Sequence, residues 1–276
     1  MKVFSVLASS VSLASAMCHY GTNLMPRDVG LERRADGDFG YDELHSALEW
    51  HSMSPNNTIC AMGKNQSPVN IKTGKYDVAD GASYKFDIVN YPHGAEFLNT
   101  GHNVQVFANG SAEFDGTKYS LAQYHFHTPS EHRIGDEYYP SEVHFVFQNG
   151  STRPCCYWFM IEIAGSGDHI NQPISKSLAK VLQIPSVGDK VTTAALNFGA
   201  LEQHIRKSDV YHYSGSLTTP PCDEGVKFNV VANPVYIDVK TFRNTKKVVK
   251  FNSRYTQNAP GEVNLLDYAR IVLDKS

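Results

Sequence analysis

Two histidines separated by a single residue, His125 and His127, lie at the end of a strand-like run at residues 119–127. In an extended strand successive side chains point to opposite faces, so the two imidazoles share one face, roughly 6–7 Å apart, and Phe126 points to the other. Buried polar side chains need partners. The pair therefore constrains the fold more than any other feature of the chain.

A second strand supplies a third histidine. Residues 142–147, which contain His144, are also rich in β-branched and aromatic side chains, and the connection from the first run contains Gly and Pro. This pattern predicts two neighbouring antiparallel strands, which can place His144 beside His125 and His127. Three neutral imidazoles on rigid strands provide three ligands of a tetrahedral zinc site, with water as the fourth, as in catalytic zinc sites.

Two further polar side chains share this face of the predicted sheet. Gln123 and Glu142 each stand two residues before a histidine, where they can hold the second ring nitrogen of a metal ligand. With 12 histidines in 276 residues, roughly 0.5 His-x-His pairs are expected by chance, so the pair alone is weak evidence for a metal site. Five polar side chains on one sheet face favour a metal site over a structural core.

Composition excludes one class of partner. The net charge of −3 and the pI of about 6.4 leave no basic stripe, so nucleic acid is not an expected partner. A hydrophobic content of 41%, without repeats or a long linker after residue 40, predicts one large globular domain.

The N-terminus has the features of a secretory signal peptide. Residues 1–16 combine Lys2, an apolar stretch and an Ala-x-Ala ending, which predicts cleavage after Ala16. The dibasic pair Arg33-Arg34 indicates a propeptide at 17–34 and a mature domain at 35–276. No apolar segment stands at the C-terminus, so we expect a secreted, extracellular protein without a membrane anchor.

Export brings expectations for asparagines and cysteines. Four sequons predict N-linked glycans, and they begin at Asn56, Asn65, Asn109 and Asn149. The last two precede Gly, which predicts hairpin turns. The odd cysteine count leaves all pairings open at this point; the five are Cys18, Cys60, Cys155, Cys156 and Cys222.

The pattern along the chain predicts many strands and few helices. Strands are expected at 84–89, 104–108, 119–127, 142–148, 157–164, 210–213 and 226–236, and amphipathic helices at 173–182 and 239–249. Because strands and helices do not alternate, we expect a mainly β (α+β) fold with a large, mostly antiparallel twisted sheet and short peripheral helices.

Further motifs share the order and spacing of a known family. They are Gln66-Ser67-Pro68-Val69-Asn70, Asn99-Thr100-Gly101-His102, Gln123-x-His125-x-His127, Ser130-Glu131-His132, Glu142-x-His144 and Ser216-Leu217-Thr218-Thr219-Pro220-Pro221-Cys222. Together they closely resemble the α-class carbonic anhydrases, in particular the secreted, glycosylated type. The resemblance extends from about residue 40 to residue 254.

The resemblance implies a fold and a reaction. Zinc would lie at the floor of a conical cleft, bound by the three histidines, and hydroxide formed on it would attack carbon dioxide to give bicarbonate and a proton. Thr218 would accept a hydrogen bond from the hydroxide and donate its own proton to Glu131, which orients the nucleophile. Thr219 would contact bicarbonate.

The same resemblance assigns a proton path and a substrate wall. His102 matches the family's proton shuttle, and Tyr41, Thr100 and Gln105 match positions that order water, although the last two replace the more common Asn. The apolar wall for carbon dioxide is matched by Val146, Leu217 and Phe228, the last in place of a more usual Trp. A further wall residue follows the two adjacent cysteines, at a register that the sequence leaves uncertain by one position.

A disulfide between Cys60 and Cys222 is also implied by the resemblance, and would tether the loop that carries Thr218. The expected partners are carbon dioxide and bicarbonate, with sulfonamide-type inhibitors. Whether the chain forms a homodimer stays open.

Two alternatives remain at this point. A cupin-type metal enzyme also uses His-x-His followed by a Glu, and it would need Glu131 as a metal ligand. A non-catalytic binding module related to carbonic anhydrase would keep the fold without the reaction, but such modules typically lack a zinc histidine, and here all three are present.

Overall fold

The described part of the chain begins just after the expected leader. The computed structural model describes residues 39–42, 45–114, 116–150 and 152–275. The expected signal peptide, propeptide and Cys18 lie outside these residues.

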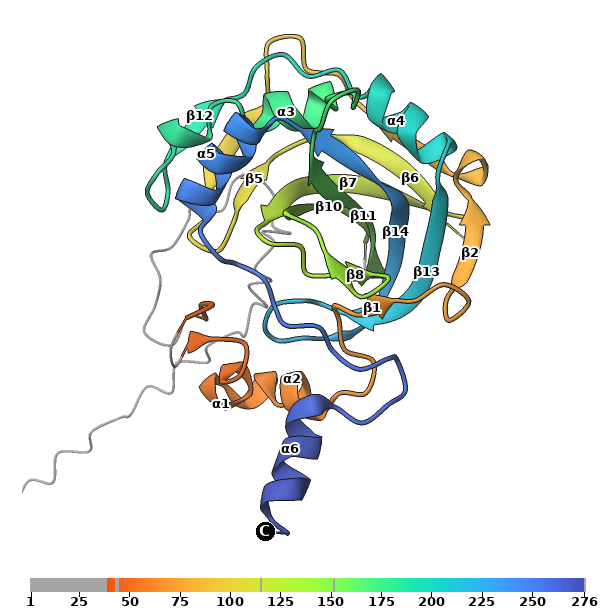
Figure 1. Cartoon of the computed structure of the whole chain (residues 1–276), viewed down its shortest axis with the longest axis vertical. Coiled ribbons are helices and arrows are strands. Elements are labelled where there is room, and N and C mark those ends of the chain that lie inside the picture. Colours follow the sequence, from red (N-terminus) through yellow and green to blue (C-terminus); the bar gives the residue numbers. More distant parts are fainter. Residues whose placement is uncertain (1–38, 43–44, 115, 151, 276) are drawn as a thin grey trace, which may run out of the picture.

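One large sheet dominates the molecule (Figure 1). In the described residues it contains 11 strands, with β3 (Lys85–Ile88) and β6 (Gly110–Phe114) paired beside β7. The remaining strands lie in the spatial order β12 (Lys190–Thr192), β4 (Glu96–Asn99), β5 (Val104–Val106), β7 (Thr117–His127), β10 (Ser141–Asn149), β11 (Thr152–Ile163), β14 (Glu224–Ile237), β13 (Asp209–Ser216) and β2 (Asp77–Asp80). A smaller sheet joins β1 (Asn70–Ile71), β8 (Arg133–Ile134) and β9 (Glu137–Tyr138).

Antiparallel pairing prevails in the large sheet, as predicted. Its one parallel pair among the described strands is β11 with β14 at the centre, and β7, β10 and β11 follow one another in antiparallel register. The connection from β11 to β14 carries helices and two other strands of the sheet, which gives it the length that a parallel crossover needs.

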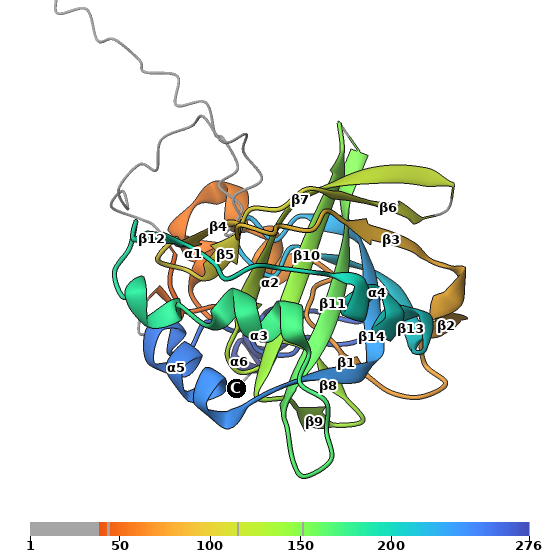
Figure 2. The ribbon, with the colours of Figure 1, turned by 90° about the horizontal axis from the view of Figure 1, so that it is seen from above.

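Short helices surround the sheet (Figures 1 and 2). They are α1 (Trp50–Met53), η2 (Pro55–Asn57), α2 (Ile59–Met62), η3 (Gly81–Ser83), α3 (Gln172–Leu178), η4 (Val181–Gln183), α4 (Gly199–Arg206), α5 (Val239–Val249) and α6 (Leu265–Leu273). Side chains of Asn171, Asp238 and Asn264 accept backbone N–H groups at the starts of α3, α5 and α6, which satisfies donors that the helix itself leaves unpaired. Among the described residues, no helix has the length and apolar character needed to cross a membrane.

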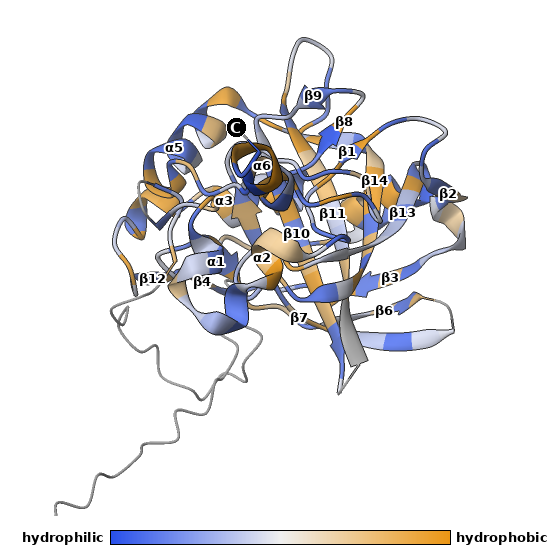
Figure 3. Ribbon diagram, turned by 90° about the horizontal axis from the view of Figure 1, so that it is seen from below, coloured by the Kyte–Doolittle hydropathy of each residue, from blue (hydrophilic) through white to orange (hydrophobic). Residues whose placement is uncertain are grey.

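The two faces of the sheet have different cores. On one face Phe126, Phe145 and Phe159 pack with Ile174 of α3 and Leu201 of α4 in the largest hydrophobic cluster. The opposite face carries a smaller cluster, and the histidines of β7 and β10 lie on that side because side chains alternate along each strand. Figure 3 shows hydrophobic residues concentrated along β10 and β11.

The seven predicted strands and the helix at 239–249 are confirmed, with differences at the strand ends. The helix predicted at 173–182 ends at Leu178 and continues as the separate turn η4. The hairpin predicted at Asn109 is wrong, because Gly110 opens β6, which pairs with β3 and β7 rather than with β5. The turn predicted at Asn149 joins β10 to β11.

Candidate zinc centre

The structure brings the three predicted imidazoles together on neighbouring strands. In the pairing of β7 with β10, His144 stands opposite His125, and His127 stands opposite Glu142. One ring nitrogen from each histidine lies within 4.8 Å of the other two, and all three side chains are buried. Strand register alone therefore produces the cluster.

In each histidine, the ring nitrogen that faces away from the cluster donates its N–H group to a fixed acceptor. This leaves the lone pairs of His125 Nε2, His127 Nε2 and His144 Nδ1 for a metal. The three bonds are His125 Nδ1 to Gln123 Oε1 at 3.0 Å, His127 Nδ1 to the Asn252 carbonyl at 2.7 Å, and His144 Nε2 to Glu142 Oε1 at 2.9 Å. Such partners fix the tautomer and the ring orientation of metal ligands.

Burial keeps two of the three imidazoles neutral. It lowers the pKa of His144 to about 3 and holds the pKa of His125 well below its ordinary value, and the neighbouring imidazoles add to both shifts. His127 Nε2 is buried with no hydrogen-bond partner in the described residues. Three imidazole nitrogens around one point, one of them otherwise without a hydrogen-bond partner, fit a zinc ion.

Glu142 connects the cluster to the backbone around it. Its Oε2 accepts the backbone N–H groups of Glu131 and His132, both at 2.8 Å, and its Oε1 accepts His132 Nδ1 at 2.7 Å as well as His144. Burial raises the pKa of Glu142, but the adjacent His132 and His144 more than offset this and hold it well below its usual range. The carboxylate is therefore ionised.

Hydrogen bonds continue outward from His132. Since its Nδ1 donates to Glu142, its Nε2 accepts the Tyr213 hydroxyl at 2.6 Å, and Tyr213 in turn accepts from Ser67 Oγ at 3.0 Å. Ser67 Oγ accepts the backbone N–H of Ser216 at 3.0 Å. A single consistent set of proton positions thus extends from Ser216 at the end of β13 to His144.

Glu131 and Thr218 lie together beside the cluster. Glu131 Oε1 accepts the backbone N–H of Arg254 at 2.9 Å, and its Oε2 has no partner within hydrogen-bond distance in the described chain. Burial raises the pKa of Glu131, whereas His127 and the approach of the Thr218 side chain lower it. Glu131 and Thr218 are therefore close enough to interact, and the hydrogen bond expected between them stays a prediction.

The loop that carries Thr218 is held from two sides. Cys60 and Cys222 form the predicted disulfide, with Cα atoms 5.1 Å apart. The buried Arg254 donates to the carbonyls of Ser67 at 2.8 Å, Cys60 at 3.1 Å and Leu217 at 3.5 Å. One guanidinium therefore joins three segments around the loop.

His102 stands on a turn tied to the same framework. Its ring is half-buried and stacks on Phe39 with centroids 4.0 Å apart. Asn252, whose carbonyl orients His127, also donates through Nδ2 to the His102 carbonyl at 3.0 Å. The Thr100 hydroxyl bonds to Asn103 and accepts the N–H of His102, so it shapes this turn.

Gln105 and Tyr41 are placed differently from each other. Gln105, on β5, lies directly opposite His125 and is fully buried. Neither its side-chain oxygen nor its side-chain nitrogen has a hydrogen-bond partner among the described residues. Tyr41 is half-buried against Trp50. Burial and the charge of Glu131 raise the pKa of Tyr41 well above its ordinary value, so its hydroxyl stays protonated and can donate.

An apolar wall adjoins the histidines. Val146 and Phe228 are buried in the smaller cluster, and Leu217 packs against it. The structure fixes the register that the sequence left uncertain. Cys156 and, after it, Trp158 lie in the smaller cluster with Val146, whereas Cys155 and Tyr157 belong to the large core. Both cysteines are buried, and neither forms a disulfide in the described residues.

Sequence reasoning missed several supporting groups. Asn252 acts on His127 through its backbone carbonyl, which no side-chain pattern reveals, and His132 and Tyr213 were not assigned roles. A signal for His132 was present, since it directly follows Glu131 in the recognised motif.

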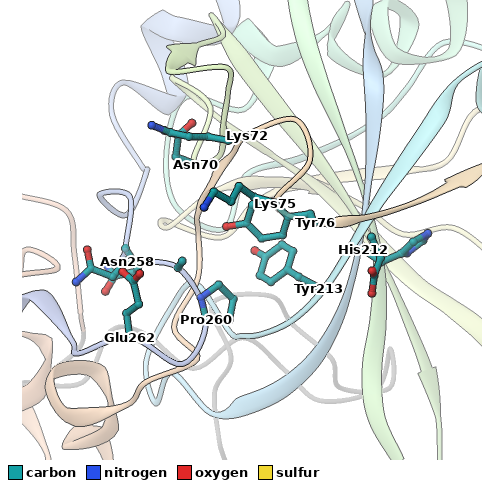
Figure 4. A pocket seen from close by; sticks show the side chains of 12 residues that line it. Asn70, Lys72, Lys75, Tyr76, His212, Tyr213, Asn258, Pro260 and Glu262 are labelled. Atoms are coloured by element: carbon teal, nitrogen blue, oxygen red, sulfur yellow. The ribbon is translucent and has the colours of Figure 1, made fainter.

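A separate hollow of about 620 Å³ is lined in part by Tyr213 (Figure 4). Its walls include Tyr76, whose ring meets Tyr213 edge-on at 5.8 Å, together with Lys75, Pro260 and Glu262. None of the three clustered histidines lines it. The hollow is therefore not the metal centre.

Three imidazoles on adjacent strands of a large sheet, with their second nitrogens fixed, match the ligand set of catalytic zinc proteins. Comparison with known proteins identifies the family. A family model described as eukaryotic-type carbonic anhydrase matches residues 45–272. The chain belongs to this family.

Relatives and solved structures agree with this assignment. A carbonic anhydrase from Neisseria gonorrhoeae is 32% identical over 229 residues, covering 79% of this chain and 84% of that protein. The fungal alpha carbonic anhydrase from Aspergillus oryzae is 39% identical with a TM-score of 0.80, covering 84% of this chain and 98% of that chain. An alpha-carbonic anhydrase from Thermovibrio ammonificans, solved with the inhibitor sulfanilamide, is 31% identical with a TM-score of 0.66. The match covers 80% of this chain and 95% of that chain.

The chain is thus a zinc enzyme that catalyses the reversible hydration of carbon dioxide to bicarbonate and a proton. The cupin alternative is wrong. Besides the family match, Glu131 approaches His127 Nδ1 at 3.7 Å and His144 Nε2 at 3.9 Å, the nitrogens that do not face the cluster.

Proposed function

We propose that His125, His127 and His144 are the zinc ligands of this carbonic anhydrase. The proposal rests on one observation. In each ring, one nitrogen is hydrogen-bonded to a fixed acceptor, and the other is directed to the common centre. When bound, zinc acidifies a coordinated water molecule and so supplies a nucleophile at neutral pH. Gln123 and Glu142 set the tautomers of two ligands.

Thr218 and Glu131 orient the attacking oxygen in this proposal. The Thr218 hydroxyl donates to the Glu131 carboxylate, so that its own oxygen is left as an acceptor towards the nucleophile. The Arg254 backbone N–H, which Glu131 Oε1 accepts at 2.9 Å, favours the ionised carboxylate that this requires. Fixing a small nucleophile in one orientation removes part of the entropic cost of the reaction.

His102 carries the released proton towards solvent. An imidazole is suited to this step because it gains and loses a proton near neutral pH. Gln105 and the protonated Tyr41 hydroxyl offer polar groups along the route, and Thr100 fixes the turn on which His102 stands.

Carbon dioxide binds against the apolar wall in this proposal. Val146, Leu217, Phe228 and Cys156 provide the nonpolar surface that an apolar gas prefers, and Thr219 contacts bicarbonate. A sulfonamide would occupy the same site, in line with the structural neighbour that was solved with sulfanilamide.

We further propose that the enzyme is secreted after removal of residues 1–16 and 17–34, leaving one catalytic domain at 35–276. The Cys60–Cys222 disulfide supports an oxidising compartment. Asn56 and Asn109 are exposed and are the best glycan acceptors, whereas the Asn65 side chain donates to Glu224 at 3.2 Å.

The deciding experiment combines metal analysis with a hydratase assay. We expect one zinc ion per chain, loss of activity after complete chelation, and recovery with zinc. The His144→Ala variant should lose tight zinc binding. Full activity in protein shown to be metal-free, or native zinc affinity in the variant, would contradict the proposal.

A further inference from the structure

Trp158 lies beside one of the proposed zinc ligands. It stands on β11 directly opposite His144 on β10, so both side chains face the same side of the sheet. The two ring centroids are 5.3 Å apart with the planes at 62°, and the indole is only 3% exposed. The indole therefore forms one side of the space that the His144 ring occupies.

The indole is itself held in place by a column of rings. It stacks on Phe228 with centroids 3.8 Å apart and planes at 10°, and Phe228 stacks on Tyr213 at 4.4 Å. Tyr213 is the residue whose hydroxyl bonds to His132, which bonds to Glu142. The column and the hydrogen-bond chain thus both begin at Tyr213 and end at the same imidazole.

These contacts restrain His144 at two separate points. The Glu142 hydrogen bond fixes Nε2, but a single hydrogen bond leaves the ring free to tilt about it. The packed indole blocks that tilt, because protein interiors do not leave room for a ring to move without displacing its neighbours. The direction of the Nδ1 lone pair is then set by both contacts.

We propose that Trp158 is a positioning residue of the zinc centre, whose ring holds the His144 imidazole at the angle that the metal requires. The inference rests on the ligand set proposed above. The Trp158 Nε1–H is buried and has no hydrogen-bond partner in the described part of the chain, so the indole acts on His144 through ring packing and not through a hydrogen bond.

Three variants separate positioning from general stability. Trp158→Leu removes the flat ring, and Trp158→Phe keeps an aromatic ring without the N–H. Phe159→Leu is the matched control, because Phe159 is the next residue on the same strand, is equally buried, and faces the large core instead of the site. Zinc affinity and the rate of zinc release are measured by competition with a chelator at a temperature at which all variants are folded.

We expect Trp158→Leu to bind zinc about 10- to 100-fold more weakly, the range found when groups that orient metal ligands are removed. Trp158→Phe should stay within about 3-fold of the native affinity, and Phe159→Leu should lose stability but keep its zinc affinity. Native affinity in folded Trp158→Leu, or equal losses in the Leu and Phe variants, would overturn the proposal.

Tryptophan emission gives a second readout that does not depend on activity. The chain contains two tryptophans, and Trp50 donates its N–H to the carbonyls of Gly40 and His45 in a different cluster. Binding of Co²⁺ should quench emission in the native protein and not in Trp158→Phe. Failure of the native protein to bind any metal would instead count against the ligand set.

Discussion

Replacing Glu142 with Gln tests the proton positions on which the zinc centre depends. The native carboxylate accepts four N–H groups, two from the backbone of Glu131 and His132 at Oε2 and two from the rings of His132 and His144 at Oε1. A glutamine of the same shape has one oxygen and one NH2 group. It cannot accept hydrogen bonds both from the two backbone N–H groups and from the two imidazole rings.

The two orientations of the amide have different consequences. With the NH2 group towards the backbone, two fixed N–H donors lose their acceptor, at about 1–3 kcal/mol each and about 2–6 kcal/mol together. With the NH2 group towards the rings, both imidazoles can respond by moving a proton. For His144 that proton would then lie on Nδ1, the nitrogen that faces the metal.

Metal-free Glu142→Gln should therefore adopt the second orientation, and zinc can bind only after the proton is displaced or the amide is turned. We expect zinc affinity to fall at least about 10- to 100-fold, and the loss of unfolding free energy to be larger in the zinc-loaded protein than in the metal-free protein. Chelator competition gives the affinity, and urea unfolding with and without zinc gives the stabilities.

A matched control is Glu113→Gln, which removes a surface carboxylate paired with Lys85 at 2.7 Å and should change zinc affinity by less than about 2-fold. If Glu142→Gln bound zinc as tightly as the native enzyme, the tautomer assigned to His144 would be refuted.

Three other outcomes are expected. Replacing Cys60 and Cys222 by Ser frees a chain segment of 162 residues and should lower the unfolding free energy by up to about 5 kcal/mol; a change below about 1 kcal/mol in urea titrations would contradict this. In metal-free protein the folded-state pKa of His144, about 3, lies below its ordinary value of 6.5, so the unfolded chain binds a proton that the folded chain does not. Stability should fall as the pH drops from 6.5 to 3, and a flat profile in urea titrations across that window would argue against the buried neutral imidazole. Cys156→Val should keep hydratase activity within about 3-fold because the wall needs only an apolar side chain of this size, and inactivity of the folded variant would assign the thiol a role beyond packing.

Alternation along strands was enough to predict the cluster of histidines. Two-residue periodicity placed His125 and His127 on one face, and the neighbouring run placed His144 beside them. This inference needs only backbone geometry and a short connection, and both are local properties of the sequence.

Groups that act through the backbone or across long connections could not be found in that way. Asn252 orients His127 with a carbonyl that every residue possesses. The register of the wall residue after the two adjacent cysteines could not be fixed because β11 is apolar on both faces, so its pattern carries no period. The Trp158 and Phe228 stack depends on the parallel pairing of β11 with β14, which no local signal specifies.

The contact between His127 and Asn252 also has a consequence for biosynthesis. The acceptor that fixes this imidazole is synthesised 125 residues after it, and proteins emerge from the ribosome N-terminal end first. A nascent chain that has exposed all three histidines still lacks the group that sets the proton on one of them. Zinc that binds before Asn252 is synthesised would therefore meet a His127 ring whose tautomer is not yet fixed.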